Sequence, residues 1–508
     1  MRRLCMALAV ATIAVAAQPT GARANLDTAA APTPDARSGR TLTTLSRAID
    51  LTKSHNVAVA LPLIRQVLAA PDFALLTSAD QHEALLVGGY CELMTHHADV
   101  AIPLLTRATQ MPEAGANDWM TMLAAAVALP DGMGAAQALT TLARRWPEAL
   151  NLYEDPSISS YVLMLLPSTP DAKEARLDLL SALYDAHWPG GRLSDGSYLW
   201  RDLALMLLER GNSDRASEVA KAIRIPRVIA GIRADRRFDA IVQKNPETFD
   251  LGRVVDIYVA ELRARAAADP DKLRTQEQLA DELIQAGRDS EALKVLDDAL
   301  AQALGPKPAF SDVEDRIMWV QNARSNALSH LGRFDDAVAA MRAGMEHQEG
   351  GEANISQAVN LAELLNRLGR PKEALEVIAR AGPGSPIGQL EVAEAKVSAY
   401  AQLGQRDKVV QLLADARTHV TDDPSAVEEM LFDVGDLDGA AALYVQRLND
   451  PAMRDRVLMD LQIWLRDGAT TPEDVEREHR FEAVRARPDV QAAVKAVGRI
   501  ETIPFRDN

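Results

Sequence analysis

The stretch WRDLALMLLERGNSDRASEVA, residues 200–220, contains the pattern that determines the fold. Leu203 and Ala204 lie on one helical face, and Gly211 follows at the point where that helix should end. Ala216 then falls on the apolar face of a second helical segment. A small residue lets two helices approach closely, and a turn glycine adopts a positive φ at little cost. The stretch therefore predicts a helix–turn–helix hairpin.

The same scheme recurs along the C-terminal half of the chain. Apolar helical segments end at turn glycines spaced by 45, 37, 35 and 31 residues, namely Gly287, Gly332, Gly369, Gly404 and Gly435. This pattern resembles the tetratricopeptide repeat, whose period is about 34 residues. The resemblance is specific for residues 197–447 and loose for 41–147. It implies an all-α solenoid of helical hairpins with a right-handed superhelical twist, which could divide into two blocks.

The sequence also predicts how the chain is organised outside the clear repeats. The expected segments are a signal peptide at 1–24, a flexible linker at 25–40, degenerate helical repeats at 41–150, an irregular helical region at 151–252 with one clear repeat at 197–223, tetratricopeptide repeats at 253–450, and a helical cap at 451–508. Residues 151–196 are expected to interrupt the array because they contain several prolines and glycines. The similar pentapeptides around Phe238 and Phe481 are each expected to close a block.

The composition bounds the class of protein. Of 508 residues, 47% are hydrophobic but only 4% are aromatic, which favours packed helices over sheets. A basic start, an apolar run and an Ala-x-Ala site ending at Ala24 predict export to the periplasm or beyond. Cleavage there would change the net charge from −17 to −20, which argues against nucleic-acid partners. No later stretch is apolar for long enough to predict a membrane span. Cys91 is expected to be a buried thiol.

A search for catalytic and metal-binding motifs supports a non-enzymatic protein without cofactors. His82 is followed by Glu83, but residue 86 is leucine, so a zinc-binding H-E-x-x-H motif is incomplete. His96 and His97 fall where a hairpin turn should be, which favours a solvated turn over a metal site. The basic stretch from Lys221 to Arg237 is expected to be ion-paired or solvated.

The resemblance also implies a binding groove. In tetratricopeptide arrays, positions 2, 5, 9 and 12 of successive first helices line a concave surface. Carried onto this chain with the turn glycine at position 15, and with position 6 added for one repeat, the spacing selects Glu277, Asp281, Trp319, Asn322, Asn326, Asn360, Glu363, Asn366, Glu391 and Glu394. This set is acidic and rich in amides. Asparagine suits an extended peptide backbone, and carboxylates favour basic groups.

Two functions remain open from the sequence. The first, which is preferred, is an exported interaction scaffold that binds an extended or basic protein segment in this groove. The second is an accessory factor for exopolysaccharide export or cell-envelope assembly, in which the groove would hold a cationic polysaccharide. Neighbouring genes for a glycosyltransferase and a deacetylase would favour the second function.

Overall fold

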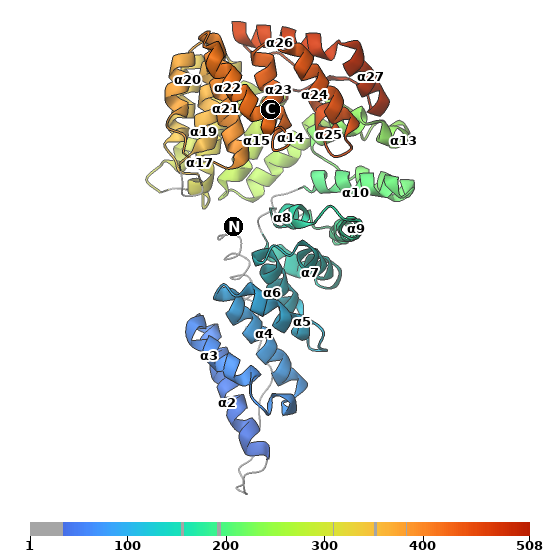
Figure 1. The fold of residues 1–508 in the computed structure, drawn as a ribbon, viewed down its shortest axis with the longest axis vertical. Helices are drawn as coiled ribbons and strands as arrows, with labels where there is room; N and C mark the ends of the chain where they lie inside the picture. Colours follow the sequence, from blue (N-terminus) through green and yellow to red (C-terminus); the bar gives the residue numbers. More distant parts are fainter. Residues whose placement is uncertain are drawn as a thin grey trace. The chain divides into compact units, whose positions relative to one another are not determined.

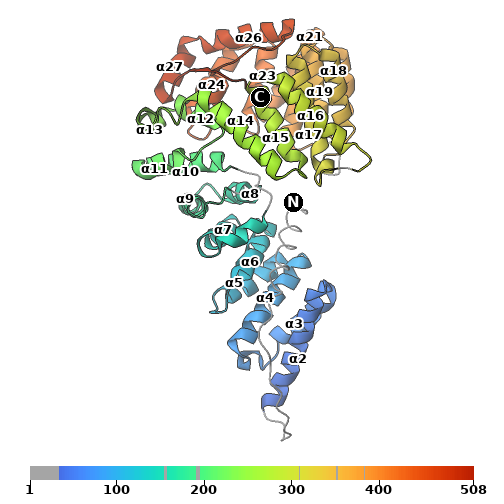
Figure 2. The same cartoon turned by 180° about the vertical axis from the view of Figure 1, so that it is seen from behind.

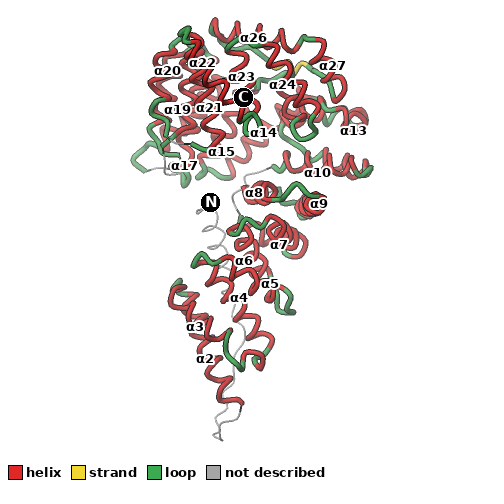
Figure 3. The backbone as a smooth tube through the Cα atoms, viewed as in Figure 1, coloured by secondary structure: helices red, strands yellow, loops and turns green. Residues whose placement is uncertain are grey.

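A computed structural model of the chain describes residues 34–153, 157–189, 195–307, 309–349, 353–382 and 384–507. These residues form two compact units, the first ending at Ile223 and the second beginning at Arg224. Both are arrays of helical hairpins, so the all-α prediction is confirmed (Figures 1 and 3). The predicted signal peptide lies outside the described residues. Within them, no helix combines the length and the apolar character that crossing a bilayer requires.

Unit 1 is a row of antiparallel helices. Its elements are α2 (Pro34–Lys53), α3 (Val57–Leu68), η1 (Phe73–Leu75), α4 (Ser78–Met94), α5 (Ala98–Thr109), α6 (Ala116–Ala128), α7 (Gly132–Arg145), η2 (Pro147–Leu152), α8 (Ser157–Leu165), α9 (Pro170–Asp185), α10 (Ser197–Glu209) and α11 (Ser213–Ala220). Sequential helices pack as neighbours, including the hairpin of α10 and α11 predicted from the sequence. Ala204 and Ala216 are fully buried in it, because each lies where the two helices approach.

Histidines replace the turn glycine in the N-terminal hairpins. His55, between α2 and α3, and His96, between α4 and α5, have φ values of 60° and 67°. Gly211, in the recognised hairpin, has a φ of 73°. The turn geometry is therefore kept where the glycine is missing, which explains why this half of the chain only weakly resembles the repeat. Cys91 in α4 is buried as expected, and burial raises the pKa of its thiol.

Two expectations for the first half need correction. Helix α2 begins at Pro34, inside the predicted linker at 25–40, and proline is well tolerated in the first turn of a helix because no amide is needed there. The stretch 151–196 does not break the array, because helix α9 packs between α7 and α10. Pro167 and Pro189 lie in connections, and Pro170 lies at the start of α9.

Unit 2 contains the regular repeats and the C-terminal segment. Its elements are α12 (Pro226–Ala234), η3 (Arg236–Phe238), α13 (Asp239–Lys244), α14 (Leu251–Ala268), α15 (Leu273–Gln285), α16 (Asp289–Ala303), α17 (Val313–His330), α18 (Phe334–Met345), α19 (Ile355–Arg367), α20 (Pro371–Ile378), α21 (Pro386–Gln402), α22 (Arg406–Thr418), α23 (Pro424–Asp433), α24 (Leu437–Asn449), α25 (Arg454–Asp460), β1 (Ile463–Trp464), α26 (Pro472–Arg485), α27 (Pro488–Val497) and β2 (Thr502–Ile503). Figure 2 shows the hairpins from behind.

The predicted turn glycines end the first helix of each regular hairpin. Gly287, Gly332, Gly369, Gly404 and Gly435 all have φ between 67° and 73°. The hairpins they connect are α15 with α16, α17 with α18, α19 with α20, α21 with α22, and α23 with α24. This part of the prediction is confirmed, because the period and the turn conformation agree at every position.

The C-terminal segment differs from the simple helical cap that was predicted for 451–508. It returns to the beginning of unit 2, where α25 packs against α12 and the guanidinium of Arg233 bonds Glu501 at 2.8 Å. Two short parallel strands, β1 and β2, form within the segment (Figure 3). Near the end of the chain, the Arg506 guanidinium donates a hydrogen bond of 2.7 Å to Asp289, the first residue of α16. Residues 451–507 therefore join the first and last parts of the unit.

The two phenylalanines do not close separate blocks. Phe238 is fully buried but belongs to the start of unit 2, beyond the end of unit 1. Phe481 is half-buried and packs against Phe432 and Tyr444, with ring centroids 5.7 and 6.3 Å away. Both rings thus stabilise unit 2, and the similarity of the two pentapeptides does not reflect equivalent positions.

Candidate functional site

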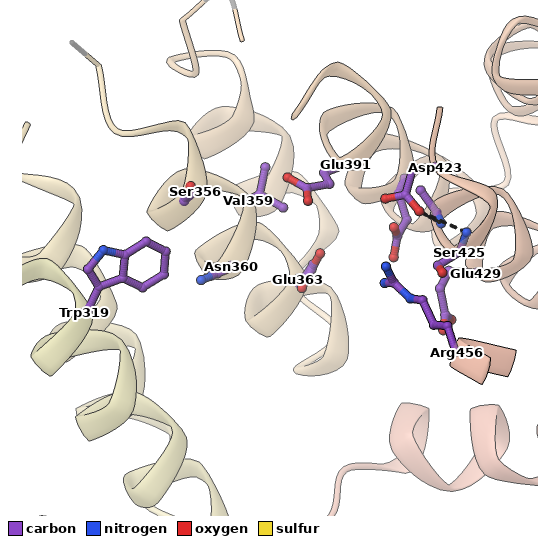
Figure 4. A pocket seen from close by; sticks show the side chains of 12 residues that line it. Trp319, Ser356, Val359, Asn360, Glu363, Glu391, Asp423, Ser425, Glu429 and Arg456 are labelled. Atoms are coloured by element: carbon purple, nitrogen blue, oxygen red, sulfur yellow. Dashed lines mark hydrogen bonds between the residues drawn. The ribbon is translucent and has the colours of Figure 1, made fainter. Parts of the chain in front are cut away.

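A cavity of about 310 Å³ opens among the first helices of the repeats in unit 2 (Figure 4). It is lined by side chains from α17, α19, α21, α23 and α25, together with the residue preceding α23. The lining residues are Trp319, Ser356, Val359, Asn360, Glu363, Glu391, Glu394, Asp423, Ser425, Ala426, Glu429 and Arg456. Its volume lies at the small end of the range for ligand sites.

Helical spacing places these side chains together. Val359 and Asn360 lie three and four residues after Ser356, and Glu363 lies four and three residues after them, so all four share one face of α19. Consecutive first helices of an array lie side by side and present corresponding faces to the same surface. The cavity is therefore a direct product of the repeat.

The cavity brings together five of the ten predicted groove residues: Trp319, Asn360, Glu363, Glu391 and Glu394. A sixth, Asn322, lies beside them and accepts a hydrogen bond of 2.8 Å from the Asn360 amide. Asn326 is half-buried on α17 and is not among the lining side chains.

The remaining three predicted residues have other surroundings. Asn366 is buried and donates a hydrogen bond of 2.9 Å to the Ala395 carbonyl, so it ties α19 to α21. Glu277 is buried in a bidentate ion pair with Arg316, in which Nε of the arginine donates to Oε2 of the glutamate at 2.7 Å. Asp281 is half-buried one turn further along α15, where burial and the charge of Glu277 raise its pKa to about 8.

The lining of the cavity is strongly acidic. It includes five carboxyl groups and one guanidinium, that of Arg456, which is exposed. Figure 4 shows Glu363 and Glu391 in the middle of the cavity, between Trp319 at one end and Asp423, Glu429 and Arg456 at the other. Burial raises the pKa of Glu391, and the nearby Asp423 carboxylate raises it further. Carboxyl groups this close repel one another when ionised.

Three of the lining carboxyl groups and one carboxyl group outside the lining form an acidic cluster with one arginine. The acidic cluster consists of Glu363, Glu394, Glu429 and Asp433. Burial raises the pKa of Glu363 and of Asp433 to about 7, and burial followed by repulsion from Glu363 raises that of Glu394. Arg477 of α26 forms an ion pair with Glu429 and acts in the opposite sense on the pKa of the other three carboxyl groups. The cluster holds more potential negative charge than this arginine neutralises.

The groove prediction missed Ser425, Glu429, Arg456 and Arg477. Ser425 and Glu429 could have been found from the sequence. With Gly435 at position 15 of the last repeat, they occupy positions 5 and 9. The two arginines could not be found in this way, because they lie beyond the last repeat and reach the site only through the return of the C-terminal segment.

Three arginines of the basic stretch, Arg227, Arg233 and Arg237, have acidic partners within unit 2. Arg233 bonds Glu501, Arg237 pairs with Asp235 and Asp455, and Arg227 pairs with Asp507. These pairs hold the C-terminal segment against α12 and η3, as expected of an ion-paired rather than a ligand-binding stretch.

The histidines considered as metal ligands have other contacts. His82 lies 2.6 Å from Asp118, and this hydrogen bond raises the pKa of the imidazole. His96 forms the turn described above. In the described part of the chain, no three His, Cys, Asp or Glu side chains converge as metal ligands would.

The acidic cluster predicts that unit 2 loses stability as the pH rises. An unfolded carboxyl group has a pKa of about 4, whereas Glu363 and Asp433 have pKa values of about 7 in the fold. The stability that unit 2 gains from holding these two groups protonated is therefore fully present below about pH 4 and is lost as the pH rises toward 7. Between pH 5 and 8, the melting temperature should fall by roughly 3–6 °C more than that of a Glu363→Gln/Asp433→Asn variant. Equal slopes for the two proteins would contradict the assignment.

No protein-family model and no curated protein matches the chain. Among solved structures, it is similar to yeast Tom70, with 13% identity, coverage of 90% of this chain and 99% of that chain, and a TM-score of 0.34. It is also similar to the TPR domain of P58(IPK) (13% identity, 81% and 100% coverage, TM-score 0.21) and to the Cut9–Hcn1 hetero-tetramer of APC/C (12% identity, 90% and 90% coverage, TM-score 0.27). TM-scores this low carry no information about what this chain binds.

Proposed function

We propose that the protein is an exported, non-catalytic interaction scaffold whose unit 2 binds a basic, extended protein segment. The observation that carries the proposal is the convergence of α19, α21 and α23, which present carboxyl groups to one cavity beside Trp319. Export is supported by the basic start, apolar run and Ala-x-Ala site of residues 1–24.

The chemistry of the lining suits a cationic side chain. Carboxylates form charge-assisted hydrogen bonds with ammonium and guanidinium groups, and an indole ring attracts cations to its face. Asn360 adds an amide that can bond a peptide backbone. A neutral or acidic segment would leave the half-buried carboxyl groups uncompensated, so the cavity should select for positive charge.

The proposal predicts that short arginine- and lysine-rich peptides bind unit 2 of the full chain and that the binding weakens with salt. Screening shortens from about 10 Å at 0.1 M salt to about 3 Å at 1 M. A Glu363→Gln/Glu394→Gln variant should lose roughly tenfold or more in affinity, because both side chains keep their shape but can no longer ionise beside a bound cation. Calorimetric titration measures both effects.

A matched control is available on the surface of the same unit. Glu247→Gln/Asp256→Asn removes the same two charges from exposed positions away from the cavity, and it should leave the affinity nearly unchanged. Salt-independent binding that both double variants retain would show that the peptide binds somewhere other than the cavity.

A cationic polysaccharide is a second candidate because of Trp319. An aromatic ring next to carboxyl groups can pack against a sugar while the acids pair with its amino groups. Partly deacetylated amino-sugar oligomers, tested in the same titrations, separate the two candidates. Tighter binding of the oligomers than of any basic peptide would favour the polysaccharide.

A further inference from the structure

We propose that Arg477 occupies the acidic cluster when no ligand is bound, and that an arginine side chain of the partner binds the cavity in competition with it. This inference rests on the proposed function and deepens it, because it names a guanidinium as the group that the cavity receives. Arg477 would then be an internal competitor that sets the affinity of the site.

The position of Arg477 follows from how α26 is held. The helix packs against α19, α23 and α24. Phe481 anchors it among the rings of Phe432 and Tyr444, and the Arg480 guanidinium donates to the Phe432 carbonyl at 3.0 Å. With these anchors in place, α26 presents Arg477 to Glu429, which is itself part of the cavity lining.

The charge around Arg477 favours its retention in the cluster. The Glu429 carboxylate has the largest effect in raising the pKa of the Arg477 guanidinium, and Asp433, Glu394 and Glu363 act in the same direction. Glu363, Glu394 and Glu429 line the cavity, so they face both the internal arginine and any cation that enters. One guanidinium cannot compensate all these carboxyl groups, and a second cation would compete for those it holds.

The ion pair is accessible enough to be exchanged. The side chain of Arg477 is 46% exposed and that of Glu429 is 32% exposed. A partially exposed pair is weak because water solvates both partners when they separate. Arg477 can therefore leave the carboxylate without opening the packing around Phe481, which holds the helix in place.

The internal occupant indicates which cation fits best. A guanidinium is planar, offers several donors in a fixed fork and stacks on aromatic faces, whereas an ammonium is a compact and strongly hydrated charge. The cluster already accepts a guanidinium from α26, and Trp319 provides an aromatic face at the other end of the cavity. An arginine peptide should therefore bind more tightly than its lysine counterpart, and a citrulline counterpart should not bind measurably.

The test compares Arg477→Met with wild type in titrations against end-blocked arginine, lysine and citrulline peptides, using the full chain. Removing the competitor should tighten binding of the arginine peptide about threefold to tenfold. Arg477→Lys keeps the positive charge but loses the forked guanidinium donors. Its affinity for the arginine peptide should therefore lie between those of wild type and Arg477→Met. Arg487→Met is the matched control, because it removes one positive charge from a surface pair with Asp438 and Asp489 and should not change the affinity.

Each outcome bears on the inference. Unchanged or weaker binding by Arg477→Met, with the wild type binding normally, would overturn the competitor role and leave the proposed function intact. Equal tightening by Arg487→Met would mean that net charge alone is responsible, which also overturns it. Absence of binding by wild type and both Arg477 variants would overturn the proposed function and this inference together. Melting curves establish that the variants are folded, and Arg477→Lys provides the test if the methionine variant is not.

Discussion

Replacing Arg506 with methionine is expected to destabilise unit 2 by about 3–5 kcal/mol. Arg506 and Asp289 are both only 7% exposed, and Nη1 of the arginine lies 2.7 and 2.8 Å from the two carboxylate oxygens. The same guanidinium bonds Asp467 at 2.6 Å and the Ile284 carbonyl at 3.1 Å. Removing it leaves a buried carboxylate whose one remaining side-chain partner among the described residues is His330, at 2.9 Å.

The Arg506 effect should depend on pH and on Asp289. Burial alone would raise the pKa of Asp289, but the hydrogen bonds from His330 and Arg506 lower it in the wild type. Without Arg506 the pKa should rise, so part of the lost stability should return as the pH falls below about 5. A second substitution, Asp289→Asn, should also recover part of the loss, because no buried charge then lacks its partner.

Denaturant unfolding monitored by tryptophan fluorescence measures the Arg506 effect. The Trp464 ring lies 5.8 Å from the Phe505 ring, beside Arg506, so its emission reports on the C-terminal segment. The surface variant Arg487→Met is the control. A loss of less than about 1 kcal/mol would show that the C-terminal segment does not hold unit 2 together.

The hairpins of this chain could be predicted because their determinants are local. A turn glycine must reach a positive φ, and a small residue must fit where two helices meet. Both requirements select particular residue types within one repeat of about 34 residues, as Gly287 and Ala292 show. The N-terminal hairpins were less clear because His55 and His96 occupy the corresponding turn positions. Histidine is less common in that conformation, so the usual signal was absent.

The return of the C-terminal segment, residues 451–507, to the first helices of unit 2 could not be predicted in the same way. It depends on contacts between residues more than 200 positions apart, such as Arg506 with Asp289 and Arg233 with Glu501. Single arginines and carboxylates are common on any acidic chain, and no spacing relates one partner to the other. The same limit explains why the groove residues on α19 and α21 could be selected while Arg477 could not.

The packing of the C-terminal segment against the first helices of unit 2 explains how positive and negative charges are distributed in the unit. The basic residues near the start of unit 2 pair with acids in the C-terminal segment, which leaves the acids of α19, α21 and α23 with few cations nearby. A chain with a net charge of −17 can therefore keep an acidic cavity uncompensated without losing the ion pairs that close the unit. This separation makes a cationic partner the natural complement of the site.

The two phenylalanines should differ in their contribution to stability. Phe238 is fully buried at the start of unit 2, so Phe238→Ala should cost about 3–5 kcal/mol through lost burial and the cavity left behind. Phe481 is half-buried, and its ring contacts Phe432, Tyr444 and the Arg485 guanidinium, so Phe481→Ala should cost about 1–3 kcal/mol.

The difference between the two variants distinguishes this structure from a chain in which each phenylalanine closes its own block. If both rings stabilise unit 2, both substitutions should shift the same unfolding transition and leave that of unit 1 in place. Hydrogen exchange of the amides in α6 and α7, which belong to unit 1, provides the control, because their protection should remain at the wild-type level. A loss of protection there in Phe238→Ala would mean that Phe238 stabilises the N-terminal unit, as the sequence alone had suggested.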